Sequence, residues 1–302
     1  MTIHNLQLNA AAAGAFNLGG DRVANRLGYG AMRLTGQPGN FGTYADWEGG
    51  QQLLRRAVEL GINFIDTAEA YGPGFNEELI ASALHPYPAD LIIATKGGIV
   101  KPSPTDIRAD ASPANLRRGC EASLQRLKVD RIDLYQLHRP DSNVPFTDSI
   151  ATLADLQREG KIRHIGLSNV SIEQIEAARQ IVPIASVQNR LNLTERDGEA
   201  VLEHCLDRGI AFIPYGPLGA NPLKQGAPLA NAGGVLTDIA RDRGVAPSQI
   251  ALAWMLHRAA NIIVIPGTTT INHLEENIAA ASIALTTDEL DTLNQMQSSK
   301  LH

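Results

Sequence analysis

Short apolar runs alternate with amphipathic stretches along most of the chain. Within each run, apolar residues occupy consecutive positions instead of every second one, which is typical of parallel strands covered on both faces. The runs are RLGYGAMRL (26–34), NFIDTA (63–68), DLIIATKGG (90–98), RIDLYQLH (131–138), HIGLSN (164–169), IASVQN (184–189), IAFIPYG (210–216) and NIIVIPG (261–267). They predict eight strands of one parallel sheet.

Amphipathic segments lie between these runs and predict helices. The clearest examples span 46–61, 112–128 and 145–161. Ser112 suits a helix cap, Pro113 suits a first helical turn, and Gly61 follows a last turn. Eight strand–helix units predict the α/β class and a (β/α)8 TIM barrel. The alternative is an open doubly wound sheet, which Gly28 and Gly30 support only in part, since no helical pattern follows them directly.

No linker or shift in composition divides the chain, so we expect one domain over residues 1–302. Residues 1–25 predict an N-terminal β-hairpin that turns at Gly19–Gly20 and lies over the barrel floor. After the last run, the segments 271–282 and 286–297 predict extra C-terminal helices. The chain ends at His302, soon after the second of them, so we expect no long tail and an open substrate site.

Composition and charge narrow the class of protein. A 44% apolar and 19% charged composition fits a soluble protein, and a net charge of −6 disfavours nucleic-acid binding. No apolar run is long enough for a membrane span. The first basic residue is Arg22, and a signal peptide needs a basic start, so that interpretation is rejected. A cytoplasmic location is therefore expected. Cys120 and Cys205 are expected to be buried thiols.

Polar side chains gather where the early strands end. Asp66 ends the second run, Tyr71 follows in the next loop, Lys96 lies near the end of the third and His138 ends the fourth. Each alone has an ordinary structural explanation, as a helix cap, a packed ring, a solvated charge or a hydrogen-bonded histidine. Because active sites of barrels of this type lie at the carboxyl ends of the strands, a shared catalytic role is favoured for the four.

These four side chains suit proton donation by a phenol. A neighbouring ammonium favours the phenolate, so Lys96 is expected to lower the pKa of Tyr71 from its ordinary value of about 10. Asp66 would keep Lys96 charged and oriented. A neutral His138 could orient a carbonyl substrate beside Tyr71. The reaction also needs a hydride donor.

An organic cofactor is the expected donor, because the histidines and cysteines show no metal-binding spacing. Asn169 and Gln188 could hold the carboxamide of a nicotinamide, and Tyr215 could stack on its ring. The loops YGPLGANPLKQG (215–226) and IPGTTTINHLEEN (265–277) are placed where barrels of this kind bind phosphate.

The ordered set of motifs resembles the aldo/keto reductase family from about residue 22 to residue 297. The motifs are FIDTAEAYG, IIATKGG, DLYQLHRPD, IGLSNV, VQNRLN, YGPLG and IPGTTTINHLEEN. The resemblance implies a catalytic tetrad of Asp66, Tyr71, Lys96 and His138. It further implies cofactor contacts from Ala31, Met32, Ser168, Asn169, Gln188, Tyr215, Gly216, Pro217, Leu218, Gly267, Thr268, Thr269, His273, Glu276 and Asn277.

Such enzymes bind NADPH and reduce aldehydes and ketones to alcohols, and the resemblance to bacterial members suggests pyridoxal or other aromatic aldehydes. Gly267 and His273 stand where relatives that strongly prefer NADPH often carry Lys and Arg, and Gly216 stands where many carry Ser, so NADH use stays open. The expected partner is a small carbonyl compound, with no metal, nucleic acid or membrane. Two alternatives are a non-catalytic NADPH-binding sensor and a metal-dependent barrel hydrolase; the sequence assigns no oligomeric state.

Overall fold

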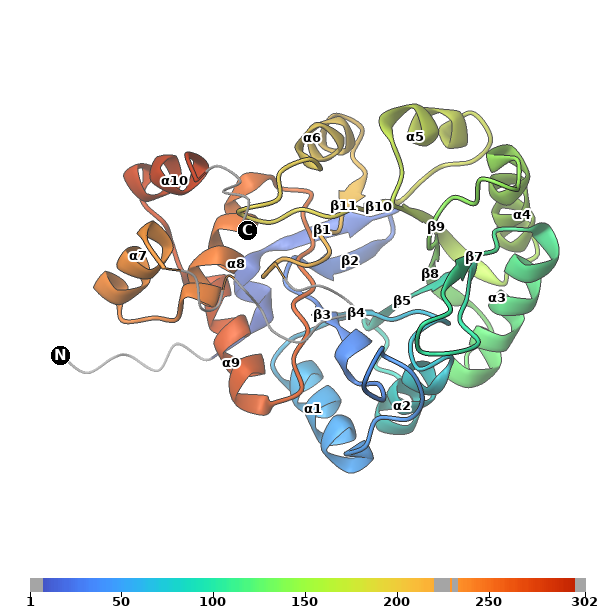
Figure 1. Cartoon of the computed structure of the whole chain (residues 1–302), viewed down its shortest axis with the longest axis horizontal. Helices are drawn as coiled ribbons and strands as arrows, with labels where there is room; N and C mark the ends of the chain where they lie inside the picture. Colours follow the sequence, from blue (N-terminus) through green and yellow to red (C-terminus); the bar gives the residue numbers. More distant parts are fainter. Residues whose placement is uncertain (1–7, 220–228, 230–232, 297–302) are drawn as a thin grey trace.

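The computed structural model describes residues 8–219, 229 and 233–296, and a ring of parallel strands lies at its centre (Figure 1). In the order β11-β10-β9-β8-β5-β4-β3, seven strands form one sheet, and every neighbouring pair is parallel. Their bounds are β3 Tyr29–Gly30, β4 Phe64–Asp66, β5 Ile92–Gly97, β8 Ile132–Leu137, β9 Ile162–Ser168, β10 Ser186–Gln188 and β11 Ala211–Phe212.

The predicted eighth run closes the barrel through single bridges instead of a regular strand. Ile262 pairs in parallel with Phe212, and Val264 pairs in parallel with Leu27. These bridges join the two edges of the sheet. Pro266, two residues after Val264, accepts a hydrogen bond from the N–H of Gly30 but has no N–H of its own to donate, so it cannot form a regular ladder pair. The predicted α/β barrel is therefore confirmed, with its last strand reduced to isolated pairs.

Helices surround the ring of strands (Figure 1). They are α1 Trp47–Glu59, α2 Phe75–Leu84, α3 Pro113–Leu127, α4 Phe146–Arg158, α5 Ile172–Arg179, α6 Glu199–Asp207, α7 Val235–Arg243, α8 Pro247–Arg258, α9 Ile271–Ala279 and α10 Thr287–Asn294. Short 3-10 turns lie at η1 Ala10–Ala13, η2 Ala31–Arg33 and η4 Ala280–Ser282. The predicted cap of α3 is present, since Ser112 accepts a hydrogen bond from the N–H of Asn115. The two expected C-terminal helices are α9 and α10.

The predicted N-terminal hairpin crosses one end of the barrel (Figure 1). Its strands, β1 Ala15–Leu18 and β2 Arg22–Asn25, pair antiparallel, and Leu18 and Ala24 pack into the cluster that fills the barrel interior. Gly19 is required at the turn for two reasons. Its φ is +61°, and a Cβ built on it would lie 2.2 Å from the His164 ring. The hairpin therefore seals the amino end of the strands.

A second small hairpin follows β5. It consists of β6 Ile99–Val100 and β7 Arg108–Ala109, which pair antiparallel. Lys101, in the loop between them, is only 9% exposed and donates hydrogen bonds to the backbone carbonyls of Gly39 and Asn40. The loop is thereby joined to the segment that follows β3. Lys101 is thus not the solvated surface charge that loop lysines usually are.

Both cysteines are free and fully buried, as predicted. Burial raises the pKa of each thiol to about 12. At neutral pH the side chains are therefore protonated and act as small apolar groups in the core. Among the described residues, no helix is both long enough and apolar enough to cross a bilayer.

Candidate active site

The four predicted catalytic side chains meet at the carboxyl end of the barrel. Asp66 is the last residue of β4, Lys96 lies in β5, and His138 directly follows β8. Tyr71 lies in the loop after β4. The three strands are neighbours in the parallel sheet, so their ends share one edge. The sequence-based grouping of these four residues is confirmed as a spatial grouping.

A buried ion pair forms the centre of the group. The Nζ of Lys96 donates hydrogen bonds to the Oδ2 of Asp66 at 2.6 Å and to the backbone oxygen of Thr67 at 2.8 Å. Lys96 is fully buried and Asp66 is 3% exposed. Burial by itself lowers the pKa of Lys96, but the charge of Asp66 and the hydrogen bonds of Lys96 to Asp66 and Tyr71 outweigh it, so the pKa is raised. Lys96 is therefore a permanent cation at neutral pH.

Two side-chain amides donate hydrogen bonds to the other oxygen of the Asp66 carboxylate. The Oδ1 atom accepts hydrogen bonds from the Nε2 of Gln188 at 2.8 Å and from the Nε2 of Gln136 at 3.3 Å. Sequence reasoning assigned Gln188 to the cofactor and missed Gln136. The available signal was its place two residues before His138 on the same strand, because side chains two apart point to the same face. Both Asp66 oxygens are thus engaged.

The phenol of Tyr71 lies within reach of the ion pair. The Nζ of Lys96 donates to the Oη of Tyr71 at 3.3 Å and lies 4.9 Å from the ring centroid. Contrary to our expectation, the pKa of Tyr71 is raised, because burial raises it by more than the Lys96 charge lowers it. Lys96 therefore makes the rise in the pKa of Tyr71 smaller but does not bring this pKa below its ordinary value. Tyr71 stays protonated at neutral pH.

His138 is held in its neutral form beside Tyr71. The two rings are edge to face, with centroids 6.0 Å apart. Burial and the charge of Lys96 are the main reasons that the pKa of His138 is lowered well below its ordinary value. Its buried Nδ1 has no hydrogen-bond partner. The side chain thus provides a neutral imidazole at the mouth of the barrel.

A buried asparagine, also missed from the sequence, supports the lysine. Asn76 is fully buried and accepts a hydrogen bond from the hydroxyl of Thr67, whose backbone oxygen is a partner of Lys96. Its Nδ2 donates to the backbone oxygens of Ala31 and Leu34. Asn76 therefore joins the segment beside Lys96 to the loop after β3. The first turn of α2, Phe75–Glu78, is polar apart from Phe75, so the sequence held no clear signal that Asn76 is buried.

The residues predicted at the nicotinamide lie together after β9, β10 and β11. Asn169 has a φ of +59° and donates to the Oγ of Ser168 and the backbone oxygen of His138. Its Oδ1 accepts from the hydroxyl of Tyr215 at 2.9 Å. The guanidinium carbon of Arg190 lies 5.9 Å from the centroid of the Tyr215 ring. Gln188 is hydrogen-bonded to Asp66. The residues predicted at the nicotinamide are therefore in contact with the four predicted catalytic residues.

Most residues predicted at the phosphates lie in α9 and in the segment before it, which packs against the residues at the end of β3. The backbones are so close that a Cβ on Gly267 would lie 2.6 Å from the oxygen of Gly30. Thr270 caps α9 by accepting from the N–H of His273. Thr268 and Asn277 are buried, whereas Gly267, Thr269, His273 and Glu276 are exposed.

The other residues predicted to contact the cofactor lie in two further segments. Ala31 and Met32 lie in η2, and Gly216, Pro217 and Leu218 follow β11. Residues 220–226 of the predicted phosphate loop lie outside the described residues.

Arg33 is a basic residue at this place that sequence reasoning missed. It belongs to η2, and its Cγ lies 3.8 Å from the position that a Cβ on Gly267 would occupy. Burial lowers the pKa of Arg33, and a guanidinium is not deprotonated in proteins. A cation therefore lies beside the predicted phosphate residues, where the sequence alone pointed to hydroxyl groups and His273.

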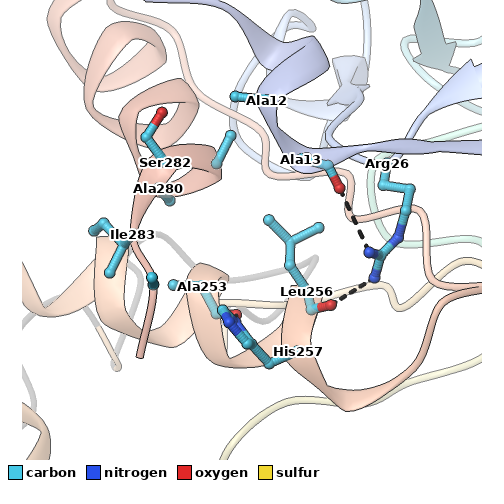
Figure 2. A pocket seen from close by; sticks show the side chains of 11 residues that line it. Ala12, Ala13, Arg26, Ala253, Leu256, His257, Ala280, Ser282 and Ile283 are labelled. Carbon is cyan, nitrogen blue, oxygen red and sulfur yellow. Dashed lines mark hydrogen bonds between the residues drawn. The ribbon is translucent and has the colours of Figure 1, made fainter. Parts of the chain in front are cut away.

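A cavity of about 420 Å³ lies at the other end of the barrel and is distinct from this site (Figure 2). Arg26 lines it and donates to the backbone oxygens of Ala13, Leu256, Ala259 and Ile262. The guanidinium caps the last turn of α8 and the segment after it. Within the part of the chain that the structure describes, no three His, Cys, Asp or Glu side chains are placed to bind a metal.

Comparisons with known proteins identify the family of the chain. The profile of the aldo/keto reductase family matches residues 26–298. The chain is 44% identical over 288 residues to an uncharacterized oxidoreductase, C215.11c, of Schizosaccharomyces pombe, covering 95% of this chain and 91% of that protein. It is 39% identical over 282 residues to pyridoxine 4-dehydrogenase of Escherichia coli, covering 91% and 96%.

The fold is similar to that of solved structures. The aldo/keto reductase from Klebsiella pneumoniae, solved in complex with NADP and acetate, superposes with a TM-score of 0.80 at 27% identity, covering 95% of this chain and 96% of that one. The family match spans most of the barrel and includes every strand end that carries a polar group. The chain is an oxidoreductase that belongs to the aldo/keto reductase family.

Proposed function

We propose that this protein reduces aldehydes and ketones to alcohols with NADPH, and that Tyr71 donates the proton. The observation that carries the proposal is the buried Asp66–Lys96 ion pair, which is hydrogen-bonded to a protonated Tyr71 beside a neutral His138. The reaction is RCHO + NADPH + H⁺ → RCH₂OH + NADP⁺. Family membership over residues 26–298 supports both the reaction class and the view that the chain acts as one catalytic domain.

The residues around the barrel mouth fit a dinucleotide. The Oδ1 of Asn169 accepts from Tyr215, and its second lone pair can accept from a carboxamide. Arg190 lies over one face of Tyr215, so the other face can take a nicotinamide ring. Gly267, Arg33 and the N-terminus of α9 suit a pyrophosphate. The relative from Klebsiella pneumoniae, solved with NADP, supports the same choice of cofactor, and NADH is the second candidate.

The side chains of this protein would act on the carbonyl oxygen. Bound NADPH would supply the hydride to the carbonyl carbon. Tyr71 would donate its phenolic proton to the oxygen, and the positive charge of Lys96 would stabilise the phenolate that remains. Asp66 keeps Lys96 charged, while neutral His138 can donate a hydrogen bond that orients the carbonyl. A proton from solvent would then restore Tyr71.

We propose pyridoxal and other aromatic aldehydes as the first substrates to examine. The 39% identity to pyridoxine 4-dehydrogenase supports this choice. His138 and Tyr71 present two aromatic rings at the mouth of the site, and flat rings pack well against an edge-to-face pair.

The test is an NADPH oxidation assay with product analysis. Pyridoxal and 4-nitrobenzaldehyde are offered separately with NADPH and with NADH, and the alcohol formed is quantified against cofactor consumed. The proposal expects one alcohol for each NADPH, with a higher kcat/KM for NADPH than for NADH. Tight NADPH binding without alcohol formation across a broad set of carbonyl compounds would instead favour the cofactor sensor.

A further inference from the structure

A second cavity at the amino end of the barrel has a volume of about 240 Å³. Its walls come from β2, from the loops that precede β5 and β8, and from the first residues of β5, β8 and β9. The residues that matter for its chemistry are Arg22, Tyr87, Arg131, Asp133 and Arg163, and we name it the floor cavity. The proposed catalytic side chains lie at the opposite ends of the same strands, so the floor cavity is separate from them.

Arg22 is held in place at one wall of the floor cavity. Its Nη1 and Nη2 donate hydrogen bonds to the backbone oxygens of Ala89 at 3.0 Å and Leu91 at 2.8 Å. Its buried Nε lies 3.4 Å from the Oδ1 of Asp133 and has no hydrogen-bond partner among the described residues. Each Nη atom carries two N–H groups, so the fixed guanidinium still has N–H donors to offer.

Arg163 approaches the same carboxylate from the neighbouring strand. Its Nε lies 3.9 Å from the Oδ1 of Asp133 and is also buried without a hydrogen-bond partner in the described part of the chain. Its Nη1 donates to Asp21 at 2.9 Å. The other oxygen of Asp133 accepts from the N–H of Ile93. One carboxylate therefore lies between two guanidinium groups, at distances too long for good hydrogen bonds to either.

Arg131 adds a third positive charge to the floor cavity. It directly precedes β8 and is exposed, and within residues 8–219, 229 and 233–296 it has neither a hydrogen bond nor an ion pair. Asp133 is the acid that lines the cavity beside the three arginines. Positive charge is in excess even when Asp21, the partner of Arg163, is counted as well. A hollow with excess positive charge and free N–H donors is suited to an anion.

The rest of the floor cavity is mostly apolar. Tyr87, Pro88 and Val129 line it and are partly or fully exposed. The hydroxyl of Tyr87 donates to the backbone oxygen of Leu127 at 2.8 Å, which fixes the direction of the ring. Aromatic groups pack favourably against such a ring. A ligand with an anionic group and an apolar body can therefore use both parts of the cavity.

We infer that the floor cavity binds a small organic phosphate monoester with an apolar or aromatic body. The phosphate group has three acceptor oxygens and about two negative charges near neutral pH, so it can accept from several guanidinium groups at once. A volume of about 240 Å³ is below the roughly 300–1,000 Å³ of pockets for drug-sized molecules, so the ligand is small. The inference does not depend on the proposed reductase activity.

The test is a calorimetric titration with phenyl phosphate at low ionic strength. Saturating NADP⁺ is present, so that the proposed cofactor site cannot bind the probe. Inorganic phosphate and phenol are titrated separately as the two halves of the probe. We expect phenyl phosphate to bind about 10-fold more tightly than either half, and its affinity to fall as salt is added. Equal affinity for inorganic phosphate would overturn the organic class of ligand, and no binding of phenyl phosphate would overturn the site.

Variants assign the binding to the floor cavity. Arg131→Gln changes an exposed side chain, so the variant should fold, and it should weaken phenyl phosphate binding about 10-fold. Arg131→Lys should restore part of the affinity, and Arg163→Gln should also weaken binding. Arg139→Gln is the matched control, because Arg139 is exposed and lies beyond the other end of β8. It should keep the wild-type affinity. If Arg139→Gln weakened binding and Arg131→Gln did not, the floor cavity would be the wrong site.

Inhibition kinetics separate the floor cavity from the substrate site. Phenyl phosphate at a saturating concentration should leave the KM for 4-nitrobenzaldehyde unchanged, whereas a rise in KM in proportion to its concentration would place it in the substrate site and overturn the inference. If the protein reduces no aldehyde, the proposed function fails. The calorimetric comparison of wild type with Arg131→Gln then still decides whether the floor cavity binds the phosphate.

Discussion

The two ends of the barrel each hold a basic side chain that is at least partly buried, and the two side chains have different kinds of partner. At the carboxyl end, Lys96 donates hydrogen bonds to the carboxylate of Asp66 and to the phenol of Tyr71. At the amino end, Arg26 donates only to backbone oxygens and lines a cavity of about 420 Å³. The cavity thus lies at the end where Arg26 binds only backbone, and the proposed chemistry lies at the end where Lys96 meets the side chains of Asp66 and Tyr71.

The largest effect is expected from removing the cation at the carboxyl end. Lys96→Met should lower kcat by about 10³-fold, because the phenolate of Tyr71 loses its counter-charge. It should also lower the free energy of unfolding by about 3–5 kcal/mol, since Asp66 is left as an unpaired buried charge. Steady-state kinetics and urea unfolding measure the two effects.

The double variant Asp66→Leu/Lys96→Met is the control for that experiment. Replacing both charges by apolar groups removes the unpaired carboxylate, so most of the lost stability should return while activity stays low. If the double variant regained activity together with stability, the ion pair would have only a structural role.

A smaller effect is expected at the asparagine that supports Lys96. Asn76→Ala leaves the hydroxyl of Thr67 and the backbone oxygens of Ala31 and Leu34 without their partner. The free energy of unfolding should fall by about 3 kcal/mol, and kcat/KM should fall as the segment beside Lys96 shifts. Asn143→Ala, at an exposed loop position, serves as the matched control. Equal kcat/KM values for Asn76→Ala and Asn143→Ala would show that Asn76 does not help to position Lys96.

A substitution at the amino end of the barrel should change the stability of the protein and leave its activity unchanged. Arg26→Met removes the donors that cap the end of α8, so urea unfolding should register a loss of about 2 kcal/mol. Activity with 4-nitrobenzaldehyde should stay within about 2-fold of wild type at a temperature where the variant is folded, because no proposed catalytic residue contacts Arg26. A large fall in kcat with the fold intact would contradict the division between the two ends.

The smallest effect is expected from pH. Burial raises the pKa of Tyr71, so its proton stays bound at neutral pH and is lost only as the pH rises through that raised value. The pKa of His138 is lowered well below its ordinary value, so His138 stays neutral as the pH falls past 6.5. The profile of kcat/KM for reduction should therefore be flat from about pH 6 to 9. A change in kcat/KM near pH 6.5 would instead indicate that His138 changes its protonation state there.

The barrel and the catalytic group could be predicted because they depend on chain order. Parallel strands bring the residues at their carboxyl ends to one edge, so Asp66, Lys96 and His138 had to be neighbours once the strands were identified. Glycines at Gly19 and Gly61 marked turns that only a positive φ allows. These features follow from local residue patterns and the topology of the fold.

The rest depends on packing at the level of single atoms. Gln136 lies inside an apolar strand and Asn76 in the polar first turn of α2, and the partners of both are known only once the backbones are placed. The direction of the Tyr71 pKa shift needed a comparison of burial with the charge of Lys96, and sequence reasoning had only the charge. The bonds of Lys101 to Gly39 and Asn40 join two loops whose paths no periodic pattern specifies.

Pre-steady-state reduction by Tyr71→Phe tests the central claim most directly. The variant keeps the aromatic ring and loses the hydroxyl group whose proton is proposed to reach the carbonyl oxygen. With NADPH bound, as verified by fluorescence, a single turnover of 4-nitrobenzaldehyde should be slower than wild type by about 10²–10⁴-fold. A single-turnover rate within a few-fold of wild type would contradict proton donation by Tyr71.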